Sequence, residues 1–421
     1  MNDLTLSLDK YLTKYENNWP LSGAILVARN GEVILRKAFG YASIEHQITN
    51  SIDTKFRIWS LTKSFTALAI MMLYEQNLLR FEDRIGTYLP ELKHFEHISI
   101  THLLNHTSGL INYTSTPDYN KTLNKLKLTH QKVLNLFMDK PLSSKPGTSF
   151  AYNNSGYYLL GMIIENITGL PFANYITNNI LKPLGMVNTG IDDNKRVVPK
   201  MAASYHSSWE EFVQCEYMDM SSIFAAGAMY STIDDLYKWD QALYSDTLVS
   251  TSTMEMAFTS NDFNYGFGWF LDQRYNRRRI YHGGAYRGFR SEMHRYPDEH
   301  TTIIMLTNYD FVPVTKLTEA LSGLLFGENI IVPTRPPSCA LQESTYASYM
   351  GTYEGYGCKA IVSRNEDQLY FIWNDEAVIP FYPISETKFH HIWQDWECDF
   401  TLEHNGELSF LGMQKTKEPS M

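Results

Sequence analysis

A serine and a lysine lie three positions apart at the start of an almost wholly apolar segment. Residues 56–70 read FRIWSLTKSFTALAI, with Ser60 one helical turn ahead of Lys63, and side chains at this spacing share one face of a helix. The apolar body of the segment predicts a central, buried helix. Burial disfavours the charged form of a lysine, so Lys63 can act as a base for the Ser60 alcohol. The first-turn N–H of Ser60 is free to stabilise an oxyanion.

A polar loop supplies a tyrosine and an asparagine two positions apart. Residues 145–157 read KPGTSFAYNNSGY, a turn and a loop that enter a predicted helix. Tyr152 can take or return the Ser60 proton if Lys63 lowers the pKa of the phenol. Asn154 can hold the Lys63 amine and a substrate carbonyl, because its amide group both donates and accepts hydrogen bonds.

A histidine followed by two glycines lies on a predicted strand. His282, Gly283 and Gly284 precede Ala285, and paired glycines weaken a strand, which indicates that something approaches the backbone there. The N–H of Ala285 is then a candidate second oxyanion donor, with His282 beside the leaving group of the substrate.

Each of these signals has an ordinary explanation when it stands alone. The S-x-x-K pattern recurs by chance about once or twice in a chain of this size, as a capping serine and a solvated lysine. The loop pair fits a capping asparagine and a packed tyrosine, and the two glycines fit a β-bulge. The case for chemistry therefore depends on their occurrence together.

Hydrophobic periodicity predicts the elements that position these segments. Apolar residues at helical spacing predict a helix over 4–15, and Asn30-Gly31 predicts the turn of a hairpin between strands 24–28 and 32–36. Helical periods dominate from about 55 to 260. Short strands are predicted at 265–270, 278–284, 288–296 and 301–308, followed by a covering helix at 315–326. The fold class is therefore α+β, an α/β sandwich whose antiparallel sheet is flanked by helices and interrupted by an all-helical region.

A proline-rich stretch divides the chain near its C-terminal fifth. Residues 329–339 contain Pro333, Pro336 and Pro337, which predicts a stiff linker between domains. Beyond it, residues 340–421 carry short, aromatic, alternating runs separated by turn signals, as in a small antiparallel β-barrel. The predicted domains are thus 1–328 and 340–421.

Together these residues resemble the serine β-lactamase and penicillin-binding-protein superfamily, in its class C-like branch of D,D-peptidases, D-aminopeptidases and family VIII esterases. The resemblance covers about residues 20 to 325, and its segments occur in the order of the family: 56–91, 100–110, 145–161, 225–243 and 265–269. The C-terminal segment, which begins near YMGTYEG, is similar to the lipocalin-like barrel of some of these hydrolases.

The resemblance implies a role for each motif. Ser60 is the acylated nucleophile, Lys63 its S-x-x-K partner, and Tyr152 with Asn154 the Y-x-N pair. The sites of this superfamily also contain a third motif on a strand, and residues 282–284 take its place. His282 and Gly283 stand where class C β-lactamases have a lysine and a hydroxyl residue that grip a substrate carboxylate. This departure predicts a preference for uncharged or amine-bearing substrates, unless Arg287 restores the missing charge.

The resulting functional prediction is a serine hydrolase. It works through an acyl-enzyme on amide or ester bonds of small substrates or short peptides, including peptides of D-amino acids. The alternative is a penicillin-binding receptor or weak β-lactamase that acylates with little turnover, or a pseudo-enzyme whose barrel binds a partner. No cofactor and no metal are expected.

Composition and charge argue against several other functions. The chain has 421 residues and a formal net charge of −10, which does not favour nucleic-acid binding, and the arginines at 274 and 277–279 fit a hairpin tip. His94, His97, His102 and His106 lack the spacing and glutamate of H-E-x-x-H, which argues against a metal enzyme. No transmembrane run and no secretory signal are found, so a cytoplasmic location is expected unless a signal peptide was removed. The four cysteines are widely spaced, which predicts free, buried thiols.

Overall fold

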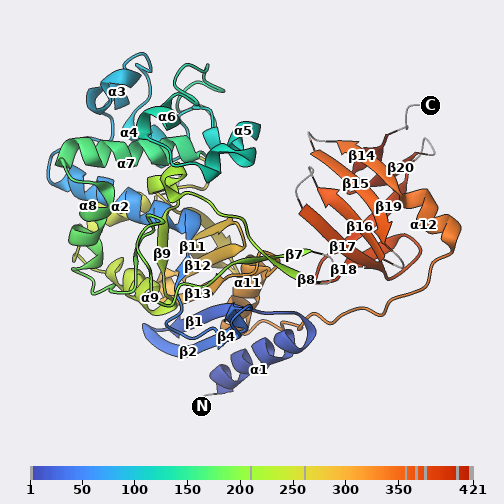
Figure 1. Cartoon of the computed structure of the whole chain (residues 1–421). Coiled ribbons are helices and arrows are strands. Elements are labelled where there is room, and N and C mark those ends of the chain that lie inside the picture. The colour runs from blue at the N-terminus through green and yellow to red at the C-terminus, as the bar shows by residue number, and fades with distance from the viewer. Residues whose placement is uncertain are drawn as a thin grey trace.

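The computed structural model describes residues 3–208, 211–259, 262–355, 358–365, 368–373, 377–403 and 407–416. A helical region lies on one side of a twisted sheet, helix α1 (Asp3–Asn18) lies on the other, and a β-barrel stands beside them (Figure 1). In the described residues, no helix has both the length and the apolar composition needed to cross a bilayer.

The central sheet of the described chain has six antiparallel strands. Their order is β10 (Phe270–Arg274), β11 (Arg277–Tyr286), β12 (Phe289–Tyr296), β13 (Thr301–Thr307), β1 (Gly23–Arg29) and β2 (Glu32–Phe39). The predicted hairpin is therefore confirmed, and it forms one edge of the sheet. Strand β1 is buried on both faces: Leu26 belongs to the core under the helical region, whereas Ile25 belongs to the core under α1.

Helices cover both faces of this sheet. Helices α1 and α11 (Val314–Leu325) share the core on one face, where Leu8 and Leu12 belong to the same cluster as Leu317 and Leu321. The helices predicted over 4–15 and 315–326 are thus confirmed. The other face carries α2 (Thr62–Glu75), α7 (Asn154–Thr168) and α9 (Ile233–Ala242). Helix α2 is apolar on almost every side and is buried, as its sequence predicts.

The region inserted between β2 and β10 is mainly helical. Its remaining helices are short: α3 (Ile85–Tyr88), α4 (Ile100–Leu104), α5 (Pro117–Lys121), α6 (His130–Leu134), α8 (Phe172–Ile176) and α10 (Thr251–Ala257). It also contains short strands that the helical periodicity does not predict. They are β3 (Tyr41–Ser43) with β4 (Ile48–Thr49), β5 (Phe56–Arg57) and β6 (Gly190–Ile191) on either side of β9 (Met229–Ser231), and β7 (Tyr205–Ser208) with β8 (Glu211–Gln214).

Two local predictions are wrong. The strand predicted at 265–270 is a turn, because Gly268 has φ +80° and only Phe270 belongs to β10. The four cysteines are free, but only Cys398 is fully buried, while Cys215, Cys339 and Cys358 are half-buried. In the 265–270 segment, the alternation of aromatic and glycine residues fits a strand and a tight turn equally well. The positive φ of Gly268 makes it a turn.

The C-terminal part of the chain is a closed antiparallel barrel. After helix α12 (Glu343–Tyr349), the described strands pair in sequence order and the last closes onto the first: β14 (Gly351–Gly355), β15 (Cys358–Asn365), β16 (Gln368–Trp373), β17 (Ala377–Pro383), β18 (Lys388–His391), β19 (Glu397–Leu402), β20 (Leu408–Phe410) and β21 (Met413–Lys415). Its core is largely aromatic. Residues 328–342 contain no helix or strand, and we propose 329–339 as the linker between domains 1–328 and 340–421.

The barrel contacts the first domain through aromatic side chains. Trp19, just after α1, stacks on His390 with 5.1 Å between ring centroids, and Phe212 packs against Trp393 at 5.0 Å. Lys316 of α11 donates a hydrogen bond to the Asp395 carbonyl. The barrel is thus attached on the side of the sheet that α1 and α11 cover.

Candidate active site

Ser60 lies in a short 3₁₀ turn, η1 (Trp59–Leu61), directly before α2. Trp59 ahead of it has φ +46°, a left-handed conformation that is costly for a bulky residue and that turns the chain sharply. Ser60 is half-buried, whereas Trp59 and Leu61 on either side are buried. The turn therefore presents the serine, and not its neighbours, to the surface of the site.

Strand β11 packs directly on this turn. A Cβ atom at Gly284 would lie 2.2 Å from the Ile58 carbonyl oxygen and 2.6 Å from the Ser60 nitrogen, so only glycine fits. The hydroxyl of Ser291 on β12 donates to the same Ile58 carbonyl at 2.7 Å. The close approach predicted from the paired glycines is thus found, and the segment that approaches is the one that carries Ser60.

Lys63 is wholly buried and has three close oxygen neighbours. Its Nζ lies 2.9 Å from Ser60 Oγ, and it donates to Asn154 Oδ1 and to the Ala226 carbonyl, each at 2.8 Å. Burial lowers the pKa of Lys63 well below its usual value, which favours the neutral amine. A neutral amine has two N–H groups and one lone pair. Because the two carbonyl oxygens can only accept, the lone pair is left facing the Ser60 hydroxyl.

Tyr152 lies beside Lys63, with 4.9 Å between Nζ and the centre of the phenol ring. The side chain is half-buried, and its hydroxyl is buried without a hydrogen-bond partner of good geometry in the described chain. Burial raises the pKa of Tyr152, and Ser60 is the group that opposes this rise. The sequence-based condition that Lys63 lowers the pKa of Tyr152 is therefore not met, because burial raises this pKa and Lys63 is not among the groups that oppose the rise.

Asn154 is the first residue of α7 and joins the helix to the loop before η3 (Tyr113–Ser115). Its Oδ1 accepts from Lys63, and its Nδ2 donates to the Thr114 hydroxyl at 2.8 Å. Its backbone N–H donates to Asn112 Oδ1 at 3.0 Å. These contacts fix the orientation of the amide, so that its oxygen faces the lysine.

His282 is buried and both of its ring nitrogens have partners. Nδ1 lies 2.7 Å from the Gly283 carbonyl, which can only accept, so Nδ1 carries the proton. Nε2 then accepts from the Tyr265 hydroxyl at 3.2 Å. Burial, with a further contribution from Lys63, lowers the pKa of His282 to about 3. His282 is thus neutral near pH 7.

A second buried histidine belongs to the same cluster, although the sequence predicts no catalytic role for it. His106 lies in the segment HTSGL, with its ring centre 4.3 Å from that of Tyr152, and its Nδ1 accepts from the Asn153 N–H. Burial lowers its pKa well below the usual value, and Lys63 and His282 lower it further. Its φ of +59° places this residue in the turn that follows α4.

The other residues predicted for the site, Gly283, Ala285 and Arg287, lie at the rim of the Ser60 site or face the far side of the sheet. A side chain at Gly283 would point away from Ser60, since its Cβ would lie 2.5 Å from Glu292 Oε2 on the far face of the sheet. Ala285 is exposed, beyond Tyr281, the last β11 residue that pairs with β10. This part of β11 therefore has one open edge. Arg287, just past the strand, forms an ion pair with Glu216 at 3.0 Å.

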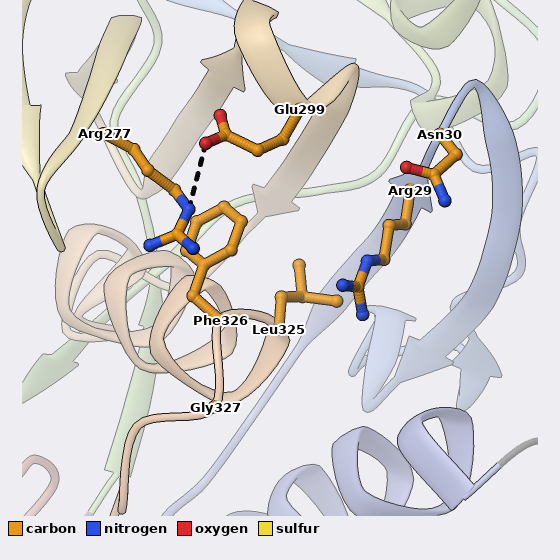
Figure 2. Close-up of a pocket in the computed structure, with 7 residues that line it drawn as sticks. All are labelled: Arg29, Asn30, Arg277, Glu299, Leu325, Phe326 and Gly327. Carbon is orange, nitrogen blue, oxygen red and sulfur yellow. Dashed lines mark ion pairs between the residues drawn. The ribbon is translucent and has the colours of Figure 1, made fainter.

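A cavity of about 340 Å³ lies at the opposite end of β11 (Figure 2). Arg277 pairs there with Glu299 at 3.0 Å and stacks over Phe326. Arg277 and Gly284 are separated by seven residues of extended strand, roughly 23 Å. The cavity is thus distinct from the Ser60 site, and Arg277, one of the two arginines that line it, already has a partner.

The histidines and arginines that were considered for metal or nucleic-acid binding have partners within the protein. His94 contacts the Met138 carbonyl, and His102 accepts from the Ser99 N–H. Within the described ranges, no group of three His, Cys, Asp or Glu residues is arranged to hold a metal ion. Three of these hairpin arginines pair with nearby carboxylates: Arg274 with Glu319, Arg277 with Glu299, and Arg279 with Asp272 and Glu319. Arg278 donates to the Phe258 carbonyl.

Comparison with known proteins identifies the family. The model of the family described as Beta-lactamase matches residues 10–323. The chain belongs to the beta-lactamase family. It is 32% identical over 418 residues to penicillin-binding protein 4* of Bacillus subtilis (strain 168), with 93% of this chain and 92% of the relative covered. As a member of this class, it is a serine hydrolase of the kind that acts on amide or ester bonds.

Two solved structures share the fold. The octameric penicillin-binding protein homologue from Pyrococcus abyssi is 25% identical, with a TM-score of 0.68 and coverage of 98% of this chain and 99% of that chain. A D-stereospecific amidohydrolase from Streptomyces sp. is also 25% identical, with a TM-score of 0.65 and coverage of 75% and 97%. The first likeness extends over the barrel, whereas the second covers three quarters of this chain.

Proposed function

We propose that the protein cleaves amide or ester bonds of small substrates or short peptides, D-amino-acid peptides among them, through an acyl-enzyme on Ser60. The observation that carries this proposal is the 2.9 Å contact between Lys63 Nζ and Ser60 Oγ in a buried environment that lowers the pKa of the lysine. A serine alcohol is a weak nucleophile until an adjacent base removes its proton.

In the first half-reaction, Lys63 takes the proton as Ser60 Oγ forms a bond to the substrate carbonyl carbon. The resulting oxyanion is stabilised by the backbone N–H groups of Ser60 and Ala285. The bond to the leaving group then breaks, and the leaving amine or alcohol receives a proton. Tyr152 is suited to that step, because its raised pKa keeps it protonated and Ser60 is the side chain that interacts with its hydroxyl. Water hydrolyses the acyl-enzyme through the same groups in reverse.

The rim favours substrates without a free carboxylate. His282 is neutral and has both nitrogens engaged, position 283 faces away from Ser60, and the charge of Arg287 is offset by Glu216. We therefore propose that esters, amides and amine-bearing short peptides are preferred over penicillins and over peptides that end in free D-Ala-D-Ala. A panel of p-nitrophenyl esters, D-amino-acid amides, D-Ala-D-Ala peptides and nitrocefin measures this preference as kcat/KM.

The nucleophile is tested by covalent labelling. The wild-type protein, Ser60→Ala and Ser64→Ala are incubated with a fluorescent penicillin, and intact mass is read at minutes and at hours. Ser64 is a matched control, because it is buried on the same helix and donates to the Leu61 carbonyl. We expect the adduct and the hydrolytic activity to disappear in Ser60→Ala alone; an adduct on another serine would refute the assignment.

The same time course separates turnover from a stable adduct. The name of the Bacillus subtilis relative, a penicillin-binding protein, supports acylation by penicillins as the second candidate function. In a receptor, the adduct persists for hours and no substrate of the panel is turned over. In a hydrolase, the adduct decays or never accumulates while product increases.

A further inference from the structure

Two cations at the mouth of the Ser60 site share one carboxylate. Glu216 Oε2 lies 2.8 Å from Lys125 Nζ and 3.0 Å from Arg287 Nη1. Lys125 ends the turn η4 (Leu123–Lys125), Glu216 follows β8, and Arg287 lies in the turn between β11 and β12. Three segments that are distant in sequence therefore meet at one oxygen atom.

This cluster is connected to the site through Tyr286. The Tyr286 ring packs edge-on against Trp59, next to Ser60, with 5.5 Å between centroids. Arg287 is two residues past Ala285, roughly 7 Å along the chain, and its guanidinium lies 5.3 Å from the centre of the Tyr286 ring. A group held by Arg287 is thus within the reach of a small substrate whose carbonyl sits at Ser60.

The two cations are positioned by contacts that do not involve Glu216. Asn124, next to Lys125, is buried and donates to the Tyr286 hydroxyl at 2.9 Å. Arg287 has φ +44° in a turn whose next residue, Gly288, is packed closely against Tyr205 and Cys215. The backbones that carry Lys125 and Arg287 are therefore held across the mouth by a buried hydrogen bond and a tight turn.

Glu216 is the most exposed member of the cluster. Its side chain is 55% exposed, against 39% for Lys125 and 23% for Arg287. Lys125 and Arg287 lower the pKa of Glu216, so it is charged when it occupies the position between them. Exposed ion pairs are weak, and another carboxylate can therefore compete with Glu216 for the two cations.

We propose that Lys125 and Arg287 form a subsite for a carboxylate group of the substrate, and that Glu216 fills this subsite in the free protein. Glu216 is then a specificity-determining residue that disfavours substrates with a free carboxylate near the scissile bond. This proposal rests on the proposed hydrolase function and names a substrate class for the same site.

The test compares a peptide acid with its amide as substrates of wild type and Glu216→Gln. Removal of the competing charge should raise the ratio of kcat/KM for acid over amide by about 5- to 10-fold, between the effect of an exposed ion pair and that of a charged hydrogen bond. The gain should appear mainly in KM. Glu216→Gln combined with Lys125→Met should lose most of this gain.

A matched control removes the same charge from the same region. Glu211 on β8 is exposed, and Glu211→Gln should leave the acid-to-amide ratio at the wild-type value. If Glu216 has only a structural role at the rim, Glu216→Gln changes kcat/KM for the acid and the amide equally. The acid-to-amide ratio then stays constant, which overturns the proposal. Loss of the hydrolase function itself is read separately, because Ser60→Ala would then retain the turnover of both substrates.

Discussion

Buried basic side chains at the two halves of strand β11 differ in whether a carboxylate pairs with them. At the first end, Arg279 is buried and forms ion pairs with Asp272 at 2.6 Å and with Glu319 at 3.0 Å, and the two carboxylates raise its pKa. Three residues further along the strand, His282 and the neighbouring Lys63 of α2 are buried without a paired carboxylate among the described residues, and burial lowers their pKa values. Arg279 thus keeps its charge, whereas His282 and Lys63 favour their neutral forms.

This difference separates a structural role from a chemical one. A paired guanidinium is held in its charged form and contributes to stability through its partners. An unpaired, buried amine gives up its proton, and it can then accept one from a neighbouring alcohol. Buried basic residues in this fold are therefore best interpreted by whether a carboxylate lies within contact distance.

The largest effect is expected at Lys63. Lys63→Ala should lower kcat by about 10²- to 10⁴-fold, the usual contribution of a positioned acid or base. Lys63→Arg should be nearly as damaging, because a guanidinium stays protonated. Addition of Tyr152→Phe to Lys63→Ala should cost little more, since residues that act as a unit show non-additive losses. Steady-state kinetics on one ester measure all the variants, the single Tyr152→Phe included, and losses that simply multiply would contradict the shared role.

The second prediction compares two adjacent glycines. Gly284→Ala places a methyl group against the backbone of Ile58 and Ser60, and a displacement of about 1 Å at the nucleophile is expected to lower kcat/KM on the order of 100-fold. Gly283→Ala places the methyl group on the far face, against Glu292. Its effect should appear as a loss of about 1 to 3 kcal/mol in unfolding free energy.

Both variants are measured by the same ester assay and by urea unfolding. The comparison between the two faces of β11 fails if Gly283→Ala lowers kcat/KM as much as Gly284→Ala does.

The third prediction concerns the paired end of the strand. Arg279→Met should leave Asp272 as an uncompensated, partly buried charge and Glu319 with Arg274 as its remaining partner, and it should lower the unfolding free energy by about 3 kcal/mol. Because this end is remote from Ser60, kcat/KM of the folded protein at 25 °C should stay near the wild-type value. Arg278→Met is the matched control, since that side chain is exposed; equal losses in the two variants would remove the distinction.

The last prediction concerns the pH dependence of stability. His106, His282 and, in the barrel, His391 have lowered pKa values, about 3 for the latter two. As pH falls below about 6.5, these histidines become protonated in the unfolded chain but stay neutral in the folded protein. Stability should therefore fall by about 1.4 kcal/mol per pH unit for each histidine, until the folded pKa is reached.

Urea unfolding at pH 7, 6 and 5 measures this slope. His391→Gln should reduce it by the share of one histidine, whereas His46→Gln, an exposed position, should not. An unchanged slope in His391→Gln would show that this histidine is protonated in the folded protein.

Much of the site follows from local sequence. The i, i+3 spacing places Ser60 and Lys63 together, and the order of the family segments brings in Tyr152 and Asn154. The positions of most sheet strands along the chain and the covering helices also follow, because hydrophobic periodicity reports which faces are buried. These features depend on short-range pattern, which a single sequence displays directly.

Other features depend on contacts that no pattern records. The third partner of Lys63 is a backbone carbonyl, that of Ala226, and a carbonyl leaves no signature in residue type. The positive φ of Trp59 is imposed by tertiary packing against the propensity of the residue. Glu216 and Lys125 lie far apart in the sequence and meet Arg287 only through the folded rim. The pleat of β11 determines which face of the sheet a side chain at position 283 would point to. The pair of glycines in the sequence does not reveal this.

The pairing of β1 with β13 also determines how long one edge of β1 stays unpaired during synthesis of the chain. Ala24 pairs with Leu306, 282 positions later, since 306 − 24 = 282. At a synthesis rate of roughly 5 to 20 residues per second, this partner strand emerges from the ribosome roughly 14 to 56 s after β1. During that interval the apolar strand GAILVA has an unpaired edge. We expect the nascent chain to require a chaperone or a transient cover for this strand, and protein synthesised more slowly at low temperature to be exposed for longer.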